Sequence, residues 1–319
     1  MLNDSILKSG SLCVVGNINR DIKTAAIPPG DHLFQDGETS VASIVETIGG
    51  GGANSAFAAA ALGAQVAFLG RVGADALGDR LEECLKQHQI AGHLARSRER
   101  ITGTSINLTY ANGQRHFVSS LPNNRALSLD DLDLTVLSGY RHLYRADIWF
   151  SRSMLFEGNR ELFQVARRSG MAVSIDLNWD PQWGSGAAAI AERKKAVRTA
   201  LPWVTLAHGN IRELNEFADS TNLERTLNLL VEWGVEGVVV HMGEQGAGYF
   251  HNGSLIIEPP VPAGNHVNTT GTGDVLSVCM MLLHHQTKIP LVDKLRLANS
   301  IVSEFIEGKR RLIPPLQPR

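Results

Sequence analysis

The chain has 319 residues, of which 43% are hydrophobic and 19% charged, so it can bury a large core without disulfides and is not a disordered chain. Its 30 basic and 32 acidic residues leave a formal charge of −2, which argues against nucleic acid or a membrane as partner. Cys13, Cys84 and Cys279 lie far apart without a CxxC pair. Such reduced thiols, with no leader-like or membrane-spanning segment, predict a cytoplasmic protein.

Short apolar runs alternate with amphipathic stretches along the whole chain. The apolar runs predict buried strands at 11–16, 66–70, 142–150, 171–176, 203–207 and 237–241. Helical spacing between them predicts helices at 75–89, 158–168, 223–233 and 275–285. This alternation predicts an α/β fold with a doubly wound, mostly parallel sheet flanked by helices, in one domain over residues 1–319.

Two segments interrupt this alternation, near residues 22–48 and 102–120. The first is polar and rich in Pro and Gly, and the second contains two alternating runs joined by Asn112-Gly113, a strong hairpin signal. We interpret both as a small antiparallel β lid inserted beside the main sheet, with decorating surface loops as the alternative. Because such a sheet exposes edge strands, it also predicts a homodimer through the lid.

A run of four glycines, Gly49 to Gly52, precedes Ala53, Asn54 and an alanine-rich helix predicted at 55–62. Glycines there let the backbone approach a ligand and leave free N–H groups at the start of the helix. Asn54 either caps this helix or reaches the ligand. The run is neither a Walker A loop nor a GxGxxG fingerprint, which makes a nicotinamide oxidoreductase a poor reading.

The second glycine cluster is Asn268-Thr-Thr-Gly-Thr-Gly-Asp274, which also opens a predicted helix. The backbone N–H groups of Gly271, Thr272 and Gly273 there form an anion nest at the positive end of the helix dipole. A carboxylate beside such a nest can accept the proton of an attacking hydroxyl, as phosphoryl transfer to an alcohol requires. The alternative is that Asp274 is a plain helix N-terminal charge.

Asn210 and Glu213 follow a predicted strand with the spacing of one helix face. An amide and a carboxylate placed so can together hold the hydration shell of Mg²⁺. A helix capping box is the more common meaning of the same pattern, and both readings stay open.

Together these features resemble the ribokinase-like, or PfkB, family of carbohydrate kinases. The similarity runs in order along nearly the whole chain, through residues 15–21, 49–54, 62–63, 70–78, 210–213, 243–246 and 268–274. Each piece is modestly specific by itself, and their order and spacing together make the resemblance strong.

The resemblance implies ATP-dependent phosphorylation of a hydroxyl of a small sugar or polyol, with Mg²⁺. It implies that Asp274 is the general base and that Gly271, Thr272 and Gly273 form the anion hole. Asp21, Gly49, Gly50 and Asn54 would bind the sugar; Gly243, Gly246 and Asn299 would line the nucleotide site; Asn210 and Glu213 would serve the metal. Dependence on a monovalent cation is left open, since Asn268 stands where Asp is common.

The chain departs from the family pattern at several positions. Thr272 replaces an Ala, Gly51 replaces the Lys of some members, and Asp180 stands where an Arg is expected. Since a phosphorylated substrate would require a cation, the last two changes predict an uncharged acceptor. Four arginines could supply the missing charge from elsewhere: Arg115, Arg125, Arg145 and Arg152.

Two further readings compete with a sugar kinase. A nucleoside kinase of the same fold shares both glycine clusters and the base. A non-catalytic family member acting as a regulator would not need Asp274, Gly273, Asn210 and Glu213 together, which disfavours it.

Overall fold

The computed structural model describes residues 3–178, 186–264 and 270–316. Its main sheet contains β1 (Ser11–Val15), β4 (Gln65–Gly73), β5 (Ile90–Ser97), β8 (His142–Arg145), β9 (Ala172–Asp176), β10 (Leu206–Asn210), β11 (Gly237–His241), β12 (Ala247–His251) and β13 (Ser254–Glu258). The strand order is β13-β12-β11-β10-β9-β8-β1-β4-β5. All neighbours from β11 to β5 are parallel, and β12 and β13 add an antiparallel edge. The predicted mostly parallel sheet is confirmed.

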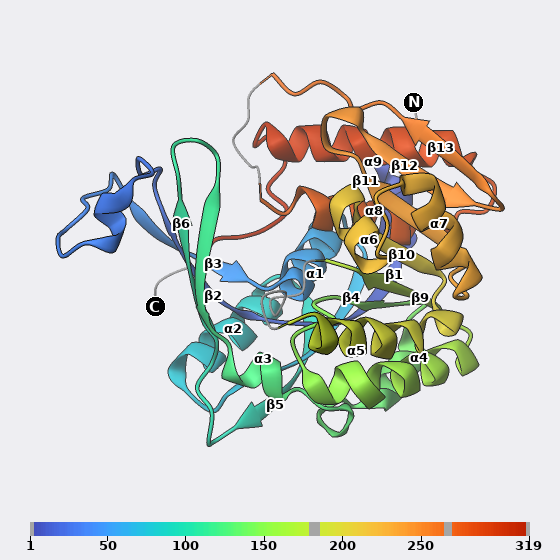
Figure 1. Cartoon of the computed structure of the whole chain (residues 1–319). Helices are drawn as coiled ribbons and strands as arrows, with labels where there is room; N and C mark the ends of the chain where they lie inside the picture. The colour runs from blue at the N-terminus through green and yellow to red at the C-terminus, as the bar shows by residue number, and fades with distance from the viewer. Residues whose placement is uncertain (1–2, 179–185, 265–269, 317–319) are drawn as a thin grey trace.

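Helices cover both faces of this sheet (Figure 1). One face packs against α1 (Gly51–Ala61), α2 (Ala76–Gln87), α8 (Thr272–His284) and α9 (Leu291–Ile306). The other packs against α4 (Asn159–Arg168), α5 (Ala187–Arg198), α6 (Ile211–Phe217) and α7 (Leu223–Glu232). A short helix, α3 (Pro122–Ala126), lies near β4.

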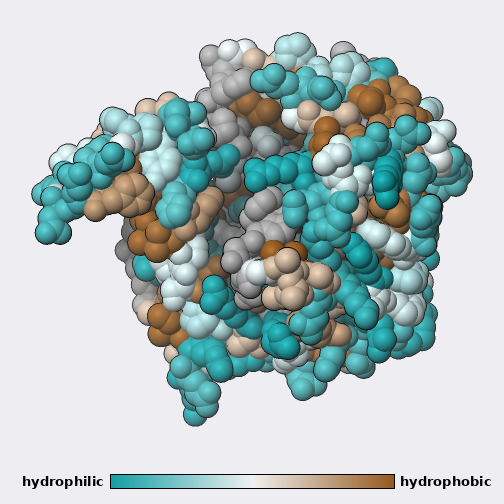
Figure 2. Space-filling view, viewed as in Figure 1, coloured by the Kyte–Doolittle hydropathy of each residue, from teal (hydrophilic) through white to brown (hydrophobic). Residues whose placement is uncertain are grey.

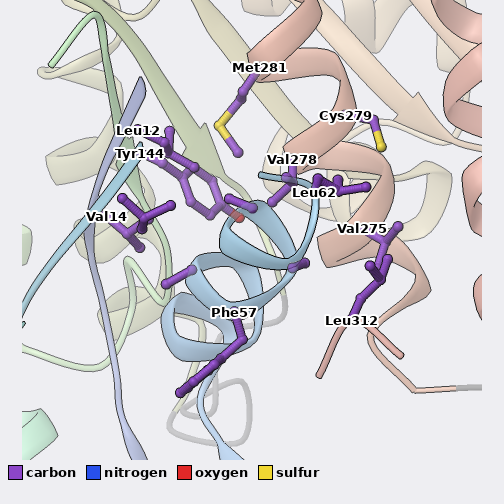
Figure 3. Packing of buried hydrophobic residues seen from close by; sticks show 14 of the residues in the cluster. Leu12, Val14, Phe57, Leu62, Tyr144, Val275, Val278, Cys279, Met281 and Leu312 are labelled. Atoms are coloured by element: carbon purple, nitrogen blue, oxygen red, sulfur yellow. The ribbon is translucent and has the colours of Figure 1, made fainter. Parts of the chain in front are cut away.

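The two faces explain why the central strands are apolar throughout. In β1, Leu12 and Val14 face the α1/α8 side, while Cys13 and Val15 face the opposite core. Figure 3 shows Leu12 and Val14 beside Tyr144 of β8, with α1 and α8 packed over them. Because both faces are covered, alternation of polar and apolar residues disappears, as in other parallel sheets.

A small sheet stands out from the body of the molecule (Figure 1). It contains β2 (Asn19–Thr24), β3 (Ile44–Gly49), β6 (Thr104–Thr109) and β7 (Arg115–Ser120), in the order β3-β2-β6-β7. The β2/β3 and β6/β7 pairs are antiparallel, whereas β2 and β6 pair in parallel. The hairpin predicted at Asn112-Gly113 is present, with Gly113 at a φ of +83°.

Two predicted strands have different limits in the structure. The strand predicted at 142–150 ends at Arg145, because Asp147 adopts a left-handed φ of +54° that no strand tolerates. The strand predicted at 203–207 begins only at Leu206, since a 3₁₀ turn with Pro202 in its first positions precedes it. As a result Asn210 is the last residue of β10.

Both glycine-initiated helices start earlier than predicted. α1 begins at Gly51 and α8 at Thr272, so part of each glycine cluster lies inside the first helical turn. The antiparallel edge β12–β13 and the edge strand β5 were not predicted, although Asn252-Gly253 between β12 and β13 is an overlooked hairpin signal.

The three cysteines are buried free thiols, as predicted. Across the described ranges, no helix is long and apolar enough to span a membrane.

Candidate active site

The carboxylate of Asp274 lies in the first turn of α8, directly after the anion nest predicted from the sequence. Gly271 is the N-cap with a φ of +86°, a conformation that favours glycine. Burial raises the pKa of Asp274 to about 7, and repulsion from Asp147 adds to this effect. A hydrogen bond from Asn54 acts in the opposite direction. Near neutral pH this group can therefore both accept and release a proton.

Asn54 reaches Asp274 and does not cap a helix. The N-cap of α1 is Gly50, and Asn54 is the fourth residue of the helix. Its Nδ2 donates to Asp274 Oδ2 at 3.2 Å, which joins the first turns of two helices that are 220 residues apart in the chain. Of the two roles left open for Asn54, the structure excludes capping.

Asp147 occupies the start of α1, where free backbone N–H groups were expected. Its carboxylate accepts the N–H groups of Asn17 at 2.9 Å, Gly51 at 3.2 Å and Gly52 at 2.9 Å. The side chain is 4% exposed and its backbone is left-handed. The expectation that these glycine N–H groups are available to a ligand is therefore wrong for Gly51 and Gly52, because a buried carboxylate from the end of β8 already binds them.

A cavity of about 480 Å³ lies between this region and the small sheet, and we call it the acidic cavity. It contains two carboxylates, two amides, two hydroxyls, two phenyl rings and one guanidinium: Asp21, Asp147, Asn17, Asn19, Ser105, Ser119, Phe117, Phe150 and Arg125, with Gly50 and Leu121. Asp21 Oδ1 accepts from Asn19 Nδ2 at 2.7 Å, and burial raises the pKa of Asp21. Such a set of donors and acceptors suits a polyhydroxylated molecule.

The predicted substrate residues only partly meet in this cavity. Asp21 and Gly50 line it, while Gly49 packs against Asp21, where a Cβ would come within 1.9 Å of Oδ1. Asn54 lines a neighbouring cavity instead. Sequence reasoning missed Asn17 and Asn19, although both lie in the 15–21 stretch that also contains the predicted Asp21.

The prediction of an uncharged acceptor depended on the absence of a nearby cation. Arg125 lines the acidic cavity, so that premise does not hold. Arg145 is buried and donates to Asn159 Oδ1 at 2.9 Å, and Arg152 lies over the ring of Phe156. Asp180 and Asn268, used in the sequence argument, lie outside the described residues.

The three residues expected at the nucleotide line one smaller cavity, of about 170 Å³. Gly243, Gly246 and Asn299 lie there with Thr272 and Gly273 from the nest. Gly246 has a φ of +93°, and a Cβ would meet the Glu258 carbonyl at 2.2 Å, so only glycine fits. Asn299 Nδ2 donates to the carbonyls of Glu258 and Pro259, so this amide holds the cavity wall.

Asn210 and Glu213 form a complete capping box at the start of α6. Glu213 N donates to Asn210 Oδ1 and Asn210 N donates to Glu213 Oε2, both at 2.9 Å. The predicted capping box is thus present in the structure. It does not decide whether the same two residues also serve a metal. Glu213 also lies close enough to Asp176 and Asp274 for its charge to raise the pKa of both.

Two buried oxygen atoms suited to a hydrated divalent cation lie at and just beyond the end of β9, where the charge of Glu213 acts on Asp176. Asp176 Oδ1 at the end of β9 and Asn178 Oδ1 are buried without hydrogen-bond partners. Burial, followed by repulsion from Glu213 and Asp274, raises the pKa of Asp176 well above its usual range. In the described part of the chain no three carboxylate, His or Cys groups come close enough to hold a metal directly. Contact through water molecules therefore fits this donor set best.

We expect Asp147→Asn to destabilise the fold by about 1–3 kcal/mol, because an amide NH₂ would face a backbone N–H donor where a carboxylate oxygen now accepts. Urea denaturation measures the change, with the exposed Asp36→Asn as the matched control. Equal stability of the Asp147→Asn variant and the parent protein would show that the three hydrogen bonds are not needed.

Comparisons with known proteins place this geometry in context. A family model described as "pfkB family carbohydrate kinase" matches residues 9–300. Among curated proteins, a ribokinase of Mus musculus is 24% identical over 314 residues, which is 94% of this chain and 90% of the relative. A fructokinase of Vibrio alginolyticus is 27% identical over 249 residues, covering 76% and 77% of the two chains.

Solved structures share the fold. A putative ribokinase II from E. coli in complex with ATP and Mg²⁺ superposes with a TM-score of 0.79 at 20% identity, covering 93% of both chains. An adenosine kinase from Sinorhizobium meliloti has a TM-score of 0.78 at 19% identity, covering 93% of this chain and 94% of that one.

Proposed function

Since the chain belongs to the pfkB family of carbohydrate kinases, we propose that it transfers a phosphoryl group from ATP to a hydroxyl of a small sugar or polyol, with Asp274 as general base. The observation that carries this proposal is the carboxylate itself. Asp274 has a pKa of about 7, lies one residue beyond the Gly271–Gly273 nest and is oriented by Asn54. A group of this pKa can take the hydroxyl proton as the new O–P bond forms.

In this proposal the residues around Asp274 bind the acceptor and stabilise the transferring phosphoryl group. The acceptor lies in the acidic cavity, where Asp21, Asn19 and the Gly50 backbone bind hydroxyl groups. The N–H groups of Thr272 and Gly273, at the positive end of α8, stabilise the negative charge of the transferring group. In this proposal the anion-binding N–H groups and the base belong to the same first turn of α8.

The nucleotide side fits ATP and Mg²⁺ by the chemistry of its own residues. Gly243, Gly246 and Asn299 line a cavity that opens onto the nest, and the orphaned oxygens of Asp176 and Asn178 can accept from metal-bound water. When bound, ATP supplies the phosphoryl group and Mg²⁺ neutralises phosphate charge. Glu213 and Asn210 would hold the hydration shell of the metal.

One observation favours a nucleoside as second candidate acceptor. Phe117 and Phe150 both line the acidic cavity, and a planar base can stack on such rings. A comparison of kcat/KM for ribose, fructose and adenosine decides between the two acceptor classes. A preference of tenfold or more for adenosine would replace the sugar in this proposal.

We expect Asp274→Asn to keep its fold and ATP affinity while turnover falls by about 10²–10⁴, the usual cost of losing a general base. The measurement is kcat at saturating acceptor, with ATP affinity determined by calorimetry. Asp293→Asn, in the first turn of α9, is the matched control for a helix N-terminal charge. Near wild-type kcat in the Asp274→Asn variant would remove Asp274 from the base role.

The rate should depend on pH in a direction set by the raised pKa of Asp274. Below about pH 7 the carboxyl is protonated and cannot accept a proton, so kcat/KM should fall about tenfold per pH unit. Above this value the rate should level off. A profile of kcat/KM between about pH 5.5 and 8, with circular dichroism to monitor the fold, tests this expectation. A flat profile would contradict it.

We expect Glu213→Gln to raise the Mg²⁺ concentration needed for half-maximal rate without changing acceptor affinity in the absence of nucleotide. Glutamine can still accept from the Asn210 N–H, so the helix cap survives and the substitution isolates the charge. Glu224→Gln, at the start of α7, serves as the control. An unchanged Mg²⁺ titration would leave Glu213 with the capping role alone.

We propose that the small sheet, with the segments near 22–48 and 102–120, closes over the acceptor as a lid within a single kinase domain over residues 1–319. One face of this sheet lines the acidic cavity, and the other exposes Ile44, Ile106 and Val118. Figure 2 shows hydrophobic residues at the surface of the projecting sheet. Closure would exclude water, so that phosphoryl transfer goes to the acceptor.

The apolar outer face of the lid predicts a homodimer. Ile44 is 64% exposed, and the paired residues Ile106 and Val118 are 39% and 55% exposed. Covering such a face with a second copy removes apolar surface from water. Sedimentation at micromolar concentration should show a dimer that Val118→Asp converts to a monomer. A monomeric wild-type protein would reject the dimer and leave the kinase proposal intact.

A further inference from the structure

A third cavity, of about 580 Å³, lies on the same face of the small sheet, next to the acidic cavity, and we call it the basic cavity. Its lining includes Lys23, Arg115, Arg311, Thr47, Asn107 and Thr109 together with Asn54, Thr270, Phe305 and the 313–315 segment. All three charged side chains are cationic, and among the described residues that line it there is no Asp or Glu. The neighbouring acidic cavity contains two carboxylates and one cation. Along this face of the small sheet, the carboxylates therefore line one cavity and most of the cations line the other.

The cations of the basic cavity form no ion pair within the described part of the chain, although the charge of Asp21 acts on Lys23. In the described ranges no carboxylate forms an ion pair with Lys23, Arg115 or Arg311, whereas the adjacent Arg310 pairs with Asp4 and Glu304. Burial has the largest effect on the pKa of Lys23 and lowers it, the charge of Asp21 raises it, and the charge of Arg115 lowers it to a smaller extent. Two like charges that face one cavity repel each other. An anion bound between them would attract both side chains and offset this repulsion.

Hydrogen-bond acceptors without partners lie beside these cations. Asn107 is 1% exposed, and its Oδ1 has no partner. Thr47 Oγ1 is likewise buried and unpaired. Lys23 and Asn107 are register partners on β2 and β6, so a cation and an orphaned acceptor stand side by side on the cavity wall. An unsatisfied buried acceptor calls for a donor such as a hydroxyl group.

We infer that the basic cavity is a subsite for a hydroxylated anion: a phosphate or carboxylate group that carries hydroxyls next to it, as in a sugar phosphate or a sugar acid. Lys23 and Arg115 bind the charged group, and Asn107 with Thr47 accept from the hydroxyls. Arg311 adds positive charge from the C-terminal segment.

The position of the subsite relates it to the reaction. Asn54, whose amide donates to Asp274, lines the cavity, and Thr270 directly precedes the nest. Arg115, on β7, also donates to the hydroxyl of Thr270. The inference rests on the proposed function only for the statement that an acceptor hydroxyl, bound in the adjacent acidic cavity, meets Asp274. Binding of an anion to the cavity requires no turnover and can be measured separately.

Calorimetric titration with inorganic phosphate and with ribose 5-phosphate, at constant ionic strength and without nucleotide, tests the subsite. Both probes should bind, and Lys23→Met or Arg115→Gln should weaken each by about tenfold or more, the loss of one charge-assisted hydrogen bond. Lys195→Met, at an exposed position of α5, is the matched control for a lost cation, and Lys23→Arg should recover binding. Melting temperatures verify that every variant is folded.

Asn107→Ala separates a hydroxylated ligand from a bare anion. It should weaken ribose 5-phosphate several-fold and leave inorganic phosphate unchanged. The inference is overturned if phosphate binds no better than chloride, or if the Lys23 and Arg115 variants bind both probes as the parent protein does. Absent phosphoryl transfer with intact anion binding would instead reject the proposed function alone.

Competition with ribose identifies where the anion comes from. If ribose displaces ribose 5-phosphate, the anionic group belongs to the acceptor, and kcat/KM for sugar phosphates should exceed that for the parent sugars. If both bind together, the anion is a separate effector. Both outcomes require the same cations, so the Lys23 and Arg115 variants must lose binding of ribose 5-phosphate in either case.

Discussion

The carboxylate of Asp147 binds backbone N–H groups from two separate parts of the chain and fixes how α1 meets the sheet. Its oxygens accept from Asn17, just beyond β1, and from Gly51 and Gly52 in the first turn of α1. The positive end of the helix dipole favours this anion, while burial disfavours it and raises the pKa of Asp147. Because α1 begins here, Asn54 lies one turn further on, within reach of Asp274.

The first turn of α8 holds a carboxylate whose pKa is far from its usual value. A helix N-terminus normally stabilises a carboxylate and lowers its pKa. At Asp274, burial and repulsion from Asp147 and Glu213 raise the pKa to about 7, although the hydrogen bond from Asn54 acts to lower it. Asp147 thus acts twice, as the anchor of α1 and as a charge that tunes the proposed base. Carboxylates that repel one another across a small space are costly for stability and useful for proton transfer.

The small sheet adds a second organisation of charge to this site. Alternation along β2 places Asp21 and Lys23 on the same face, two residues apart, so one strand serves both the acidic and the basic cavity. As a result, one end of this sheet face is negatively charged and the other end is positively charged. A ligand with hydroxyls at one end and an anionic group at the other would fit both cavities, whereas an uncharged sugar would leave the cations of the basic cavity without a partner.

Sequence alone determined the elements whose signals are local. Apolar runs indicated the parallel sheet, Asn112-Gly113 the hairpin, and Gly271–Gly273 the helix start before Asp274, since backbone conformation depends on neighbouring residues. Tertiary structure decided which distant groups meet. The bond from Asn54 to Asp274 and the capture of the glycine N–H groups by Asp147 join residues about 95 or more positions apart. Burial sets the pKa of Asp274, and burial is a property of the packed chain and not of the motif.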